Sequence, residues 1–243
     1  MAKALSCART HPGKVRAHNE DALLERASDG LWVVADGMGG HQEGARASRL
    51  VVERLAETPL SGSLDQRLEQ VRWVLHDINR RLTQDLTVIA DGTSRLIGTT
   101  VVALLLVDSQ AACVWAGDSR AYLWRGHQLY QLTRDHRLQE RLIDIDGLSP
   151  QQAIRHPRAH ALTQALGARN VVALDVVRFD LQSGDHLLLS SDGLHGELEE
   201  RALGAALSLP SPVLALERLL DGVLQGPARD NLTAIVIHPQ EVA

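Results

Sequence analysis

Two kinds of hydrophobic pattern alternate along the chain. Short runs rich in Leu, Val, Ile and Ala, bounded by Asp, Gly and Ser, are typical of β-strands. We predict such strands at residues 4–9, 22–26, 31–35, 99–107, 111–116, 120–124, 171–179, 186–190 and 232–237. Longer segments repeat apolar residues every three or four positions, which predicts helices at 46–57, 64–86, 138–145, 150–156, 197–207 and 212–224.

The spacing of the predicted strands indicates the fold class. Only a few residues separate the strands between positions 99 and 124, whereas parallel crossovers need a dozen or more, so these strands pair antiparallel. Strands also cluster at both ends of the chain, with helices in pairs between the clusters, unlike the regular alternation of a doubly wound sheet. We expect an α+β fold: a four-layer α-β-β-α sandwich in which two central antiparallel sheets are flanked by helix pairs.

Composition narrows the possible functions. The chain has 243 residues, and we expect residues 1–243 to form a single domain with a sizeable core. Its formal charge of −5 argues against a nucleic-acid partner, because phosphate backbones bind basic surfaces. Cys7 and Cys113 lie in apolar runs and make no disulfide framework, so we expect buried free thiols in a reducing compartment. The chain opens without a secretory signal, and its apolar run Val101–Val107 is too short to span a membrane, so we expect a cytoplasmic protein.

Acidic residues stand at the ends of the predicted strands, where a carboxylate is held rigidly and can face a cleft. These residues are Glu20, Asp21, Asp36, Asp118, Asp192 and Asp230. Several carboxylates that converge repel one another unless a cation lies between them. Mg²⁺ and Mn²⁺ prefer oxygen ligands, and the chain has neither HExxH nor paired CxxC, so a zinc site is not indicated. Two such ions would activate a bridging water and hold a phosphoryl group.

Each of these features also has a plainer interpretation. Asp-Gly pairs are most often turns, and they recur along this chain. Asp36 and Asp192 differ because each ends a long apolar strand and no partner strand follows promptly. Arg16, close to the first acids, could hold phosphate oxygens or could be a surface arginine. Three histidines are candidate proton donors or, alternatively, solvated or structural side chains: His18, His41 and His136.

Together these residues resemble the metal-dependent serine/threonine phosphatase family called PP2C or PPM. The matching segments are VRAHNED, VVADGMGGHQEGARAS, GTT, WAGDSRAYLWR, LTRDH, HPRAHALTQALG, LLLSSDGL and DNLTAIVI, in the family's order from residue 15 to 237. The resemblance is to bacterial stand-alone members, some of which belong to type VI secretion loci. It implies the sandwich described above, with a dinuclear metal centre of Mn²⁺ or Mg²⁺ at one edge.

The resemblance also implies roles for individual residues. Asp36 would bridge both metals, Gly37 would supply a carbonyl, and the remaining ligands would be Glu20, Asp192 and Asp230. Asp21 would orient metal-bound water, and Arg16 would bind the substrate phosphate. Asp118 would be a ligand of a weaker third metal that shares Asp192. The catalytic set is therefore Asp36, Asp192, Arg16 and Asp21, and the implied reaction is direct attack by a metal-bridging hydroxide.

The chain departs from many eukaryotic members at Met38, where they carry a histidine proposed as general acid. Residues 138–160 correspond to a variable flap beside the cleft, which contains Asp144, Asp146 and Gly147 and could select substrates or merely connect elements. We expect a monomer that acts on phosphoproteins and opposes a serine/threonine kinase. The alternatives are a non-catalytic scaffold that binds phosphoproteins or a kinase, and a hydrolase of small phosphoesters. A scaffold of this fold should have lost metal ligands, and here all the expected acids are present.

Overall fold

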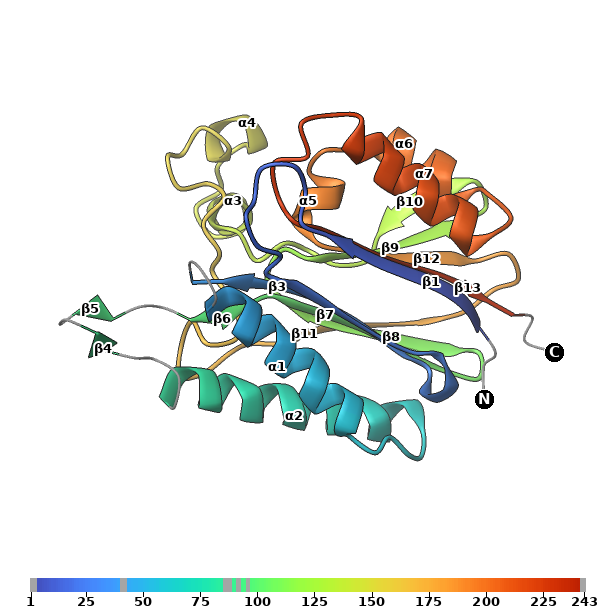
Figure 1. The fold of residues 1–243 in the computed structure, drawn as a ribbon, viewed down its shortest axis with the longest axis horizontal. Helices are drawn as coiled ribbons and strands as arrows, with labels where there is room; N and C mark the ends of the chain where they lie inside the picture. The colour runs from blue at the N-terminus through green and yellow to red at the C-terminus, as the bar shows by residue number, and fades with distance from the viewer. Residues whose placement is uncertain (1–3, 40–42, 85–88, 91–92, 95–96, 241–243) are drawn as a thin grey trace.

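Two antiparallel sheets stack at the centre of the molecule (Figure 1). The computed structural model describes residues 4–39, 43–84, 89–90, 93–94 and 97–240. The first sheet has the strand order β1 (Ala4–His11), β13 (Leu232–Pro239), β12 (His186–Ser190), β9 (Arg120–Arg125) and β10 (Gln128–Gln131). The second has the order β11 (Asp175–Asp180), β8 (Gln110–Ala116), β7 (Val101–Val107), β3 (Leu31–Met38) and β2 (Asp21–Arg26), with β6 (Gly98–Thr99) paired to the end of β3. A separate two-stranded ribbon joins β4 (Ile89–Ala90) and β5 (Thr93–Ser94).

The burial of β3 shows how the layers form. Successive strand residues project to opposite faces of a sheet. Leu31, Val33 and Ala35 accordingly join the core beneath the helices, whereas Trp32 and Val34 join the core between the two sheets. All five are fully buried. The uninterrupted apolar segment LWVVA is thus a strand that is covered on both faces.

Helix pairs cover the outer faces of both sheets (Figure 1). Helices α1 (Glu43–Glu57) and α2 (Leu64–Gln84) pack on the sheet that contains β3. Helices α6 (Glu200–Leu207) and α7 (Pro212–Leu224) pack on the sheet that contains β12 and β13. The predicted four-layer α-β-β-α sandwich is confirmed. Short helical segments complete the fold: η1 (Ala27–Asp29), α3 (Leu138–Asp144), α4 (Pro150–Ala153) and α5 (Asp192–His195).

Element boundaries differ from the predictions where local contacts override the pattern. Strand β10 was not predicted, because its sequence QLYQ is polar and short; it forms since Gly126 and His127 both adopt positive φ in the tight turn after β9. Helix α5 was not predicted either, and α6 begins at Glu200 rather than at 197. Strand β11 begins at Asp175 rather than at 171. The predicted helix 64–86 ends at Gln84 as α2, and its last positions lie outside the described residues.

The thiols are free, as predicted. Cys113 is fully buried in β8, and burial raises the pKa of its thiol strongly. Cys7 in β1 is only half-buried, which differs from the prediction, because β1 is an edge strand of its sheet. Within the described part of the chain, no helix combines the length and the apolar character needed to cross a membrane.

Candidate active site

The sheets bring the predicted acids to a common edge. Asp21 and Asp36 are direct register partners in the β2–β3 pair. In the other sheet, β12 and β13 are paired neighbours. Asp192 follows the end of β12, and Asp230 lies just before β13. Burial and repulsion from Asp21, Asp192, Asp118 and Asp230 raise the pKa of Asp36 well above its usual value. Residues separated by up to about two hundred positions thus form one electrostatic cluster.

The backbone around Asp36 is fixed by the segment Gly98–Thr100. The Asp36 N–H donates to Thr100 Oγ1 at 3.1 Å, and the Asp36 carbonyl accepts from Thr100 N at 2.8 Å and from Thr99 Oγ1 at 2.9 Å. Thr100 Oγ1 also lies 2.7 Å from Ser119 Oγ. These bonds fix the backbone from which the Asp36 side chain projects and give the GTT segment a positional role.

A close approach of backbone segments explains the glycines after Asp36. A Cβ on Gly37 would lie 2.1 Å from the carbonyl oxygen of Gly44 and 2.7 Å from that of Glu20. The Gly37 N–H donates to the Glu20 carbonyl at 3.1 Å, and Ser48 Oγ donates to the same oxygen at 2.5 Å. Glycine at 37 and 44 therefore allows Glu20, β3 and the start of α1 to meet. Sequence reasoning missed Gly44, although it belongs to the segment GGHQEGARAS.

Asp21 is buried beneath the cluster. Its Oδ2 accepts hydrogen bonds of 2.7 Å from Ser191 Oγ and from Thr233 Oγ1, whereas Oδ1 has no hydrogen-bond partner among the described residues. Burial, together with repulsion from Asp192 and Asp230, raises the pKa of Asp21 to about 6 despite those two bonds. A carboxylate with one anchored and one unpartnered oxygen is suited to orient a metal-bound water.

Asp192 interacts with both its acidic and its basic neighbours. Burial and repulsion from Asp118 and Asp230 raise the pKa of Asp192 to about 6, although Arg137 and a hydrogen bond with Asp36 act in the opposite direction. The arrangement gathers excess negative charge at a point where a cation could bind.

Asn231 joins the segment that carries Glu20 to the segment that carries Asp230. Its Oδ1 accepts from the Glu20 N–H at 2.8 Å, and its Nδ2 donates to the carbonyls of Pro12 at 3.0 Å and His18 at 2.9 Å. Sequence reasoning also missed this residue. Its signal was its place directly after Asp230, in the segment DNLTAIVI.

Arg16 lies beside the cluster. Its Nη2 donates to Asp230 Oδ2 at 2.7 Å, and the arginine side chain is 53% exposed. An exposed guanidinium next to the acids remains accessible to an anion that approaches from solvent. This geometry suits a phosphate-binding group.

Of the candidate histidines, His136 and His18 are described, and neither side chain bonds to an acid of this cluster. His136 accepts from the Gly117 N–H through Nδ1 and contacts Asp175 through Nε2 at 3.2 Å, so both ring nitrogens have protein partners. His18 is exposed and contributes its backbone carbonyl to Asn231. His41 lies outside the described residues.

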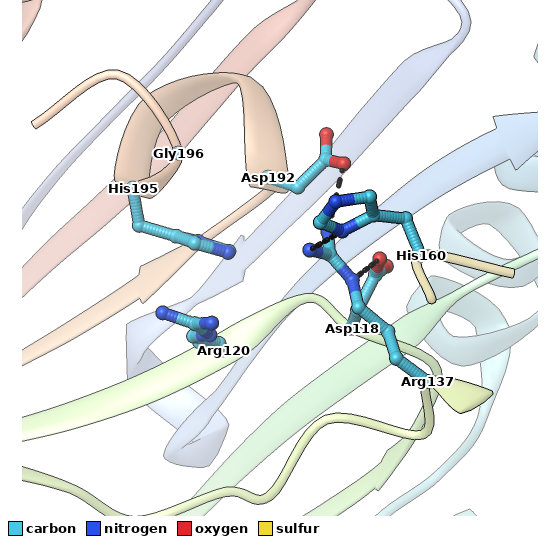
Figure 2. Close-up of a pocket in the computed structure, with 7 residues that line it drawn as sticks. All are labelled: Asp118, Arg120, Arg137, His160, Asp192, His195 and Gly196. Atoms are coloured by element: carbon cyan, nitrogen blue, oxygen red, sulfur yellow. Dashed lines mark hydrogen bonds and ion pairs between the residues drawn. The ribbon is translucent and has the colours of Figure 1, made fainter. Parts of the chain in front are cut away.

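A cavity of about 320 Å³ lies beside Asp118 and Asp192 (Figure 2). It is also lined by Arg120, Arg137, His160, His195 and Gly196. Arg137 donates to Asp118 Oδ2 at 2.6 Å and to Asp192 Oδ2 at 3.2 Å. None of the basic lining residues was singled out from the sequence, because isolated Arg and His residues carry no distinctive pattern.

The acids fit hard divalent cations by their chemistry. The donors are carboxylate oxygens, burial and mutual repulsion raise the pKa of Asp36 and Asp192, and Asp21 keeps one buried oxygen without a partner in the described structure. Among the described residues, no group of three His, Cys, Asp or Glu side chains is already arranged to hold a metal ion. The carboxylates repel one another and turn instead to Arg16 and Arg137.

Comparisons with known proteins agree on one family. The sequence profile described as Protein phosphatase 2C matches residues 12–230. The serine/threonine phosphatase stp of Listeria monocytogenes is 34% identical over 197 residues, which cover 79% of this chain and 78% of that protein. Protein phosphatase PhpP of Streptococcus pneumoniae is 31% identical over 239 residues, which cover 96% of each.

Solved structures match nearly the whole chain. PppA, a key regulatory component of the type VI secretion system in Pseudomonas aeruginosa, superposes with a TM-score of 0.89 at 36% identity, covering 98% of this chain and 99% of that one. The catalytic domain of the phosphatase PstP in complex with two manganese ions gives 0.84 at 30% identity, with the same coverage. By sequence and by structure, the chain belongs to the protein phosphatase 2C family of metal-dependent serine/threonine protein phosphatases.

Proposed function

We propose that this protein hydrolyses phosphoserine and phosphothreonine in proteins by direct attack of a hydroxide that bridges two metal ions. The observation that carries the proposal is the meeting of Asp36, Asp192 and Asp230 at one edge, where burial and mutual repulsion raise the pKa of Asp36 and Asp192. When bound there, two Mn²⁺ or Mg²⁺ ions lower the pKa of water and supply a hydroxide at neutral pH.

The residues of the chain then have distinct tasks. Asp36 would hold both ions, and Glu20, Asp192, Asp230 and the Gly37 carbonyl would complete the protein ligands. Asp21, fixed by Ser191 and Thr233, orients water with its remaining oxygen. Arg16 is accessible from solvent and binds the phosphate that is to be cleaved. No side chain has to form a phosphoenzyme.

The flap beside the site is the candidate for substrate selection. The flap at 138–160 carries α3 and α4, and Arg134 joins it to the domain through Glu140 and Asp144 at 2.9 and 2.7 Å. The exposed Asp146 and Gly147 lie beyond this attachment. We assign substrate selection to the flap within a single catalytic domain that acts as a monomer.

A role beside a serine/threonine kinase follows from the proposed reaction, which removes the phosphate that such a kinase adds. The likeness to PppA, described as a key regulatory component of a type VI secretion system, suggests that pathway. The substrate would be a phosphoprotein, which includes the kinase itself or its target. Co-expression with a kinase from the same genome would test this, with the phosphorylation of both proteins followed by mass spectrometry.

A metal-dependence assay tests the enzymatic proposal. Phosphoserine and phosphothreonine peptides and p-nitrophenyl phosphate are incubated with Mn²⁺, Mg²⁺ or EDTA. We expect hydrolysis of the peptides with metal and none in EDTA. Metal-independent hydrolysis would contradict the mechanism, absence of hydrolysis with binding of phosphopeptides would indicate a scaffold, and cleavage of small esters alone would indicate a different substrate class.

A further inference from the structure

Arg137 occupies a central place beside the proposed metal centre. It directly precedes α3, and its backbone forms a β-bridge with Leu162. Its Nε donates to Asp118 Oδ2 at 2.6 Å, and its Nη2 donates to Asp192 Oδ2 at 3.2 Å (Figure 2). One guanidinium thus joins an acid of the β8–β9 loop to an acid at the end of β12.

The surroundings keep this contact charged. Asp118 is 6% exposed, and the Arg137 side chain is 19% exposed. A buried charge without a partner is costly, whereas a guanidinium that cannot lose its proton stays available as the partner at every ordinary pH. Arg137 therefore remains a cation beside these two acids at every ordinary pH.

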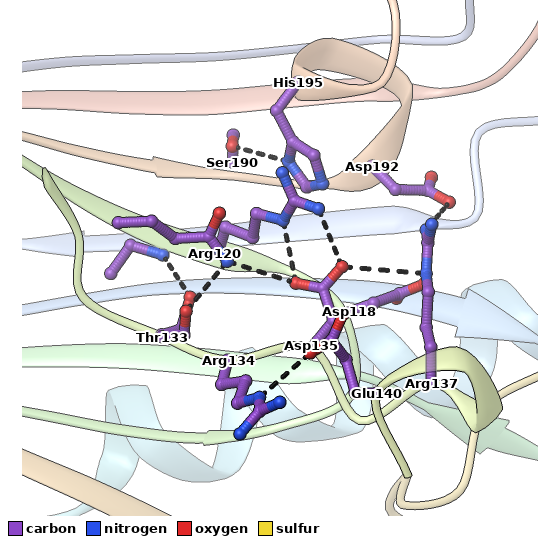
Figure 3. Close-up of polar contacts among 12 residues, drawn as sticks. Asp118, Arg120, Thr133, Arg134, Asp135, Arg137, Glu140, Ser190, Asp192 and His195 are labelled. Carbon is purple, nitrogen blue, oxygen red and sulfur yellow. Dashed lines mark hydrogen bonds and ion pairs between the residues drawn. The ribbon is translucent and has the colours of Figure 1, made fainter. Parts of the chain in front are cut away.

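Further contacts hold Arg137 in position. Asp135 lies 3.8 Å from Arg137 Nε and is itself bound by Arg120 through two bonds of 2.7 and 2.8 Å (Figure 3). His160 Nδ1 approaches Arg137 Nη1 at 3.4 Å. The guanidinium is consequently part of a connected set of charged groups and is not a loose surface side chain.

The same two acids are those that the family resemblance assigns to a weaker third metal. A divalent cation and a guanidinium would compete for the same carboxylate oxygens, because both are cations that need them as partners. The distances of 2.6 and 3.2 Å show that the guanidinium already holds both. Arg137 is poorly placed to bind the substrate phosphate, because its guanidinium donors already point at the carboxylates of Asp118 and Asp192.

We propose that Arg137 is a built-in cation that takes the place of a third metal ion between Asp118 and Asp192. The inference rests on the proposed two-metal function and concerns how many ions the site accepts. Arg137 neutralises Asp118 permanently and positions Asp192 for the two-metal centre. It is a positioning residue, because its contacts are to Asp118 and Asp192 rather than to the reacting atoms.

The number of bound ions tests this without reference to activity. Mn²⁺ binding is measured by isothermal titration calorimetry and by the electron paramagnetic resonance signal of free Mn²⁺. We expect two ions in the unaltered protein and one additional, weaker ion in Arg137→Gln and Arg137→Ala. The additional ion should vanish in the double variant Arg137→Gln/Asp118→Asn. Arg137→Lys, which keeps the charge, should bind two.

Arg134→Ala is the matched control, since Arg134 is a nearby arginine that pairs with Glu140 and Asp144 instead. Its Mn²⁺ count should equal that of the unaltered protein. Asp118→Asn alone leaves Arg137 in place and should also leave the count at two. Loss of an ion in Asp118→Asn, or an unchanged count in folded Arg137→Gln, would overturn the inference. Absence of any Mn²⁺ binding by the unaltered protein would instead refute the proposed function.

Discussion

Asp21 and Asp36 lie directly opposite each other in the β2–β3 ladder. Like charges at such positions destabilise an antiparallel pair. Here Asp21 is also buried and is fixed by the hydroxyl groups of Ser191 and Thr233. A sheet selected for stability alone would not place two acids there. The pairing is explained when a cation normally offsets their charge.

The first prediction concerns Asp36. Replacing it with Asn removes the charge that would bridge both ions while keeping the size of the side chain. We expect Asp36→Asn to lower kcat at least about 100-fold, since loss of a metal or an activated nucleophile removes several kcal/mol of transition-state stabilisation. Hydrolysis of p-nitrophenyl phosphate with Mn²⁺ measures this, and circular dichroism verifies the fold. Near-normal turnover would remove Asp36 from the mechanism.

The second prediction concerns pH and the metal-free protein. The folded state raises the pKa of Asp192 from 3.8 to about 6, so between those values it holds a proton that the unfolded state has lost. Stability must therefore fall as pH rises through this window, and the loss persists above pH 6. In EDTA, Asp192→Asn should be more stable than the unaltered protein by about 1 kcal/mol at pH 7.5, a value reduced for the partial exposure of Asp192.

Urea unfolding in EDTA at pH 4 and pH 7.5 checks this difference. The gain in stability from Asp192→Asn should shrink towards zero at pH 4, where Asp192 of the folded, unaltered protein is protonated and therefore as neutral as Asn. Asp221→Asn, a change to an exposed aspartate on α7, is the control and should show no such trend. A gain that is the same at both pH values would argue against a charge effect.

The third prediction concerns Arg16. Truncation to Ala removes one charge-assisted contact to phosphate and should raise KM about tenfold, with a smaller fall in kcat. Lys14→Ala is a suitable control, because Lys14 is a neighbouring cation that donates to the Gly226 carbonyl rather than to an acid. Steady-state kinetics with a phosphopeptide distinguish the two variants. Equal KM values for Arg16→Ala and the unaltered enzyme would exclude the proposed phosphate contact.

The fourth prediction concerns Gly37. An alanine Cβ would lie 2.1 Å from the Gly44 carbonyl oxygen, so β3 and α1 would have to separate. We expect Gly37→Ala to lose about 1–3 kcal/mol of stability and to weaken Mn²⁺ binding. Gly222→Ala in α7 is the control, because the nearest atom there belongs to the flexible Leu198 side chain at 3.1 Å. Similar behaviour of both variants would show that the close approach is unimportant.

The fifth prediction concerns a histidine pair away from the site. His238 stacks on His186 with ring centroids 3.5 Å apart, and burial and the nearby His186 lower the pKa of His238 to about 4. Between pH 6.5 and 4 the unfolded state binds a proton that the folded state rejects, so stability falls as pH decreases. His238→Phe should lose less stability from pH 7 to pH 4.5 than the unaltered protein in chemical denaturation. An identical pH dependence of both proteins would contradict this.

The sandwich layers and the acids of the site could both be predicted from the sequence, because both are marked by apolar strands. Strands such as LWVVA are apolar on both faces, and an acid at their end, such as Asp36, stands out from that background. Helix α5 and strand β10 are short and were missed, since their formation depends on neighbours in space. Asn231 and Arg137 were missed as well, because their roles come from contacts to other segments of the chain, 19 and 55 positions away for Arg137 and 213 for Asn231.

The most direct test of the central claim is a crystal structure of the protein grown with Mn²⁺, with anomalous diffraction used to locate the ions. We predict two anomalous peaks within ligand distance of Asp36 carboxylate oxygens, with Asp192 and Asp230 contributing further ligands. Arg16 should leave Asp230 in that state and turn towards solvent. Peaks at other positions only, or none at this edge of the sheets, would contradict the account.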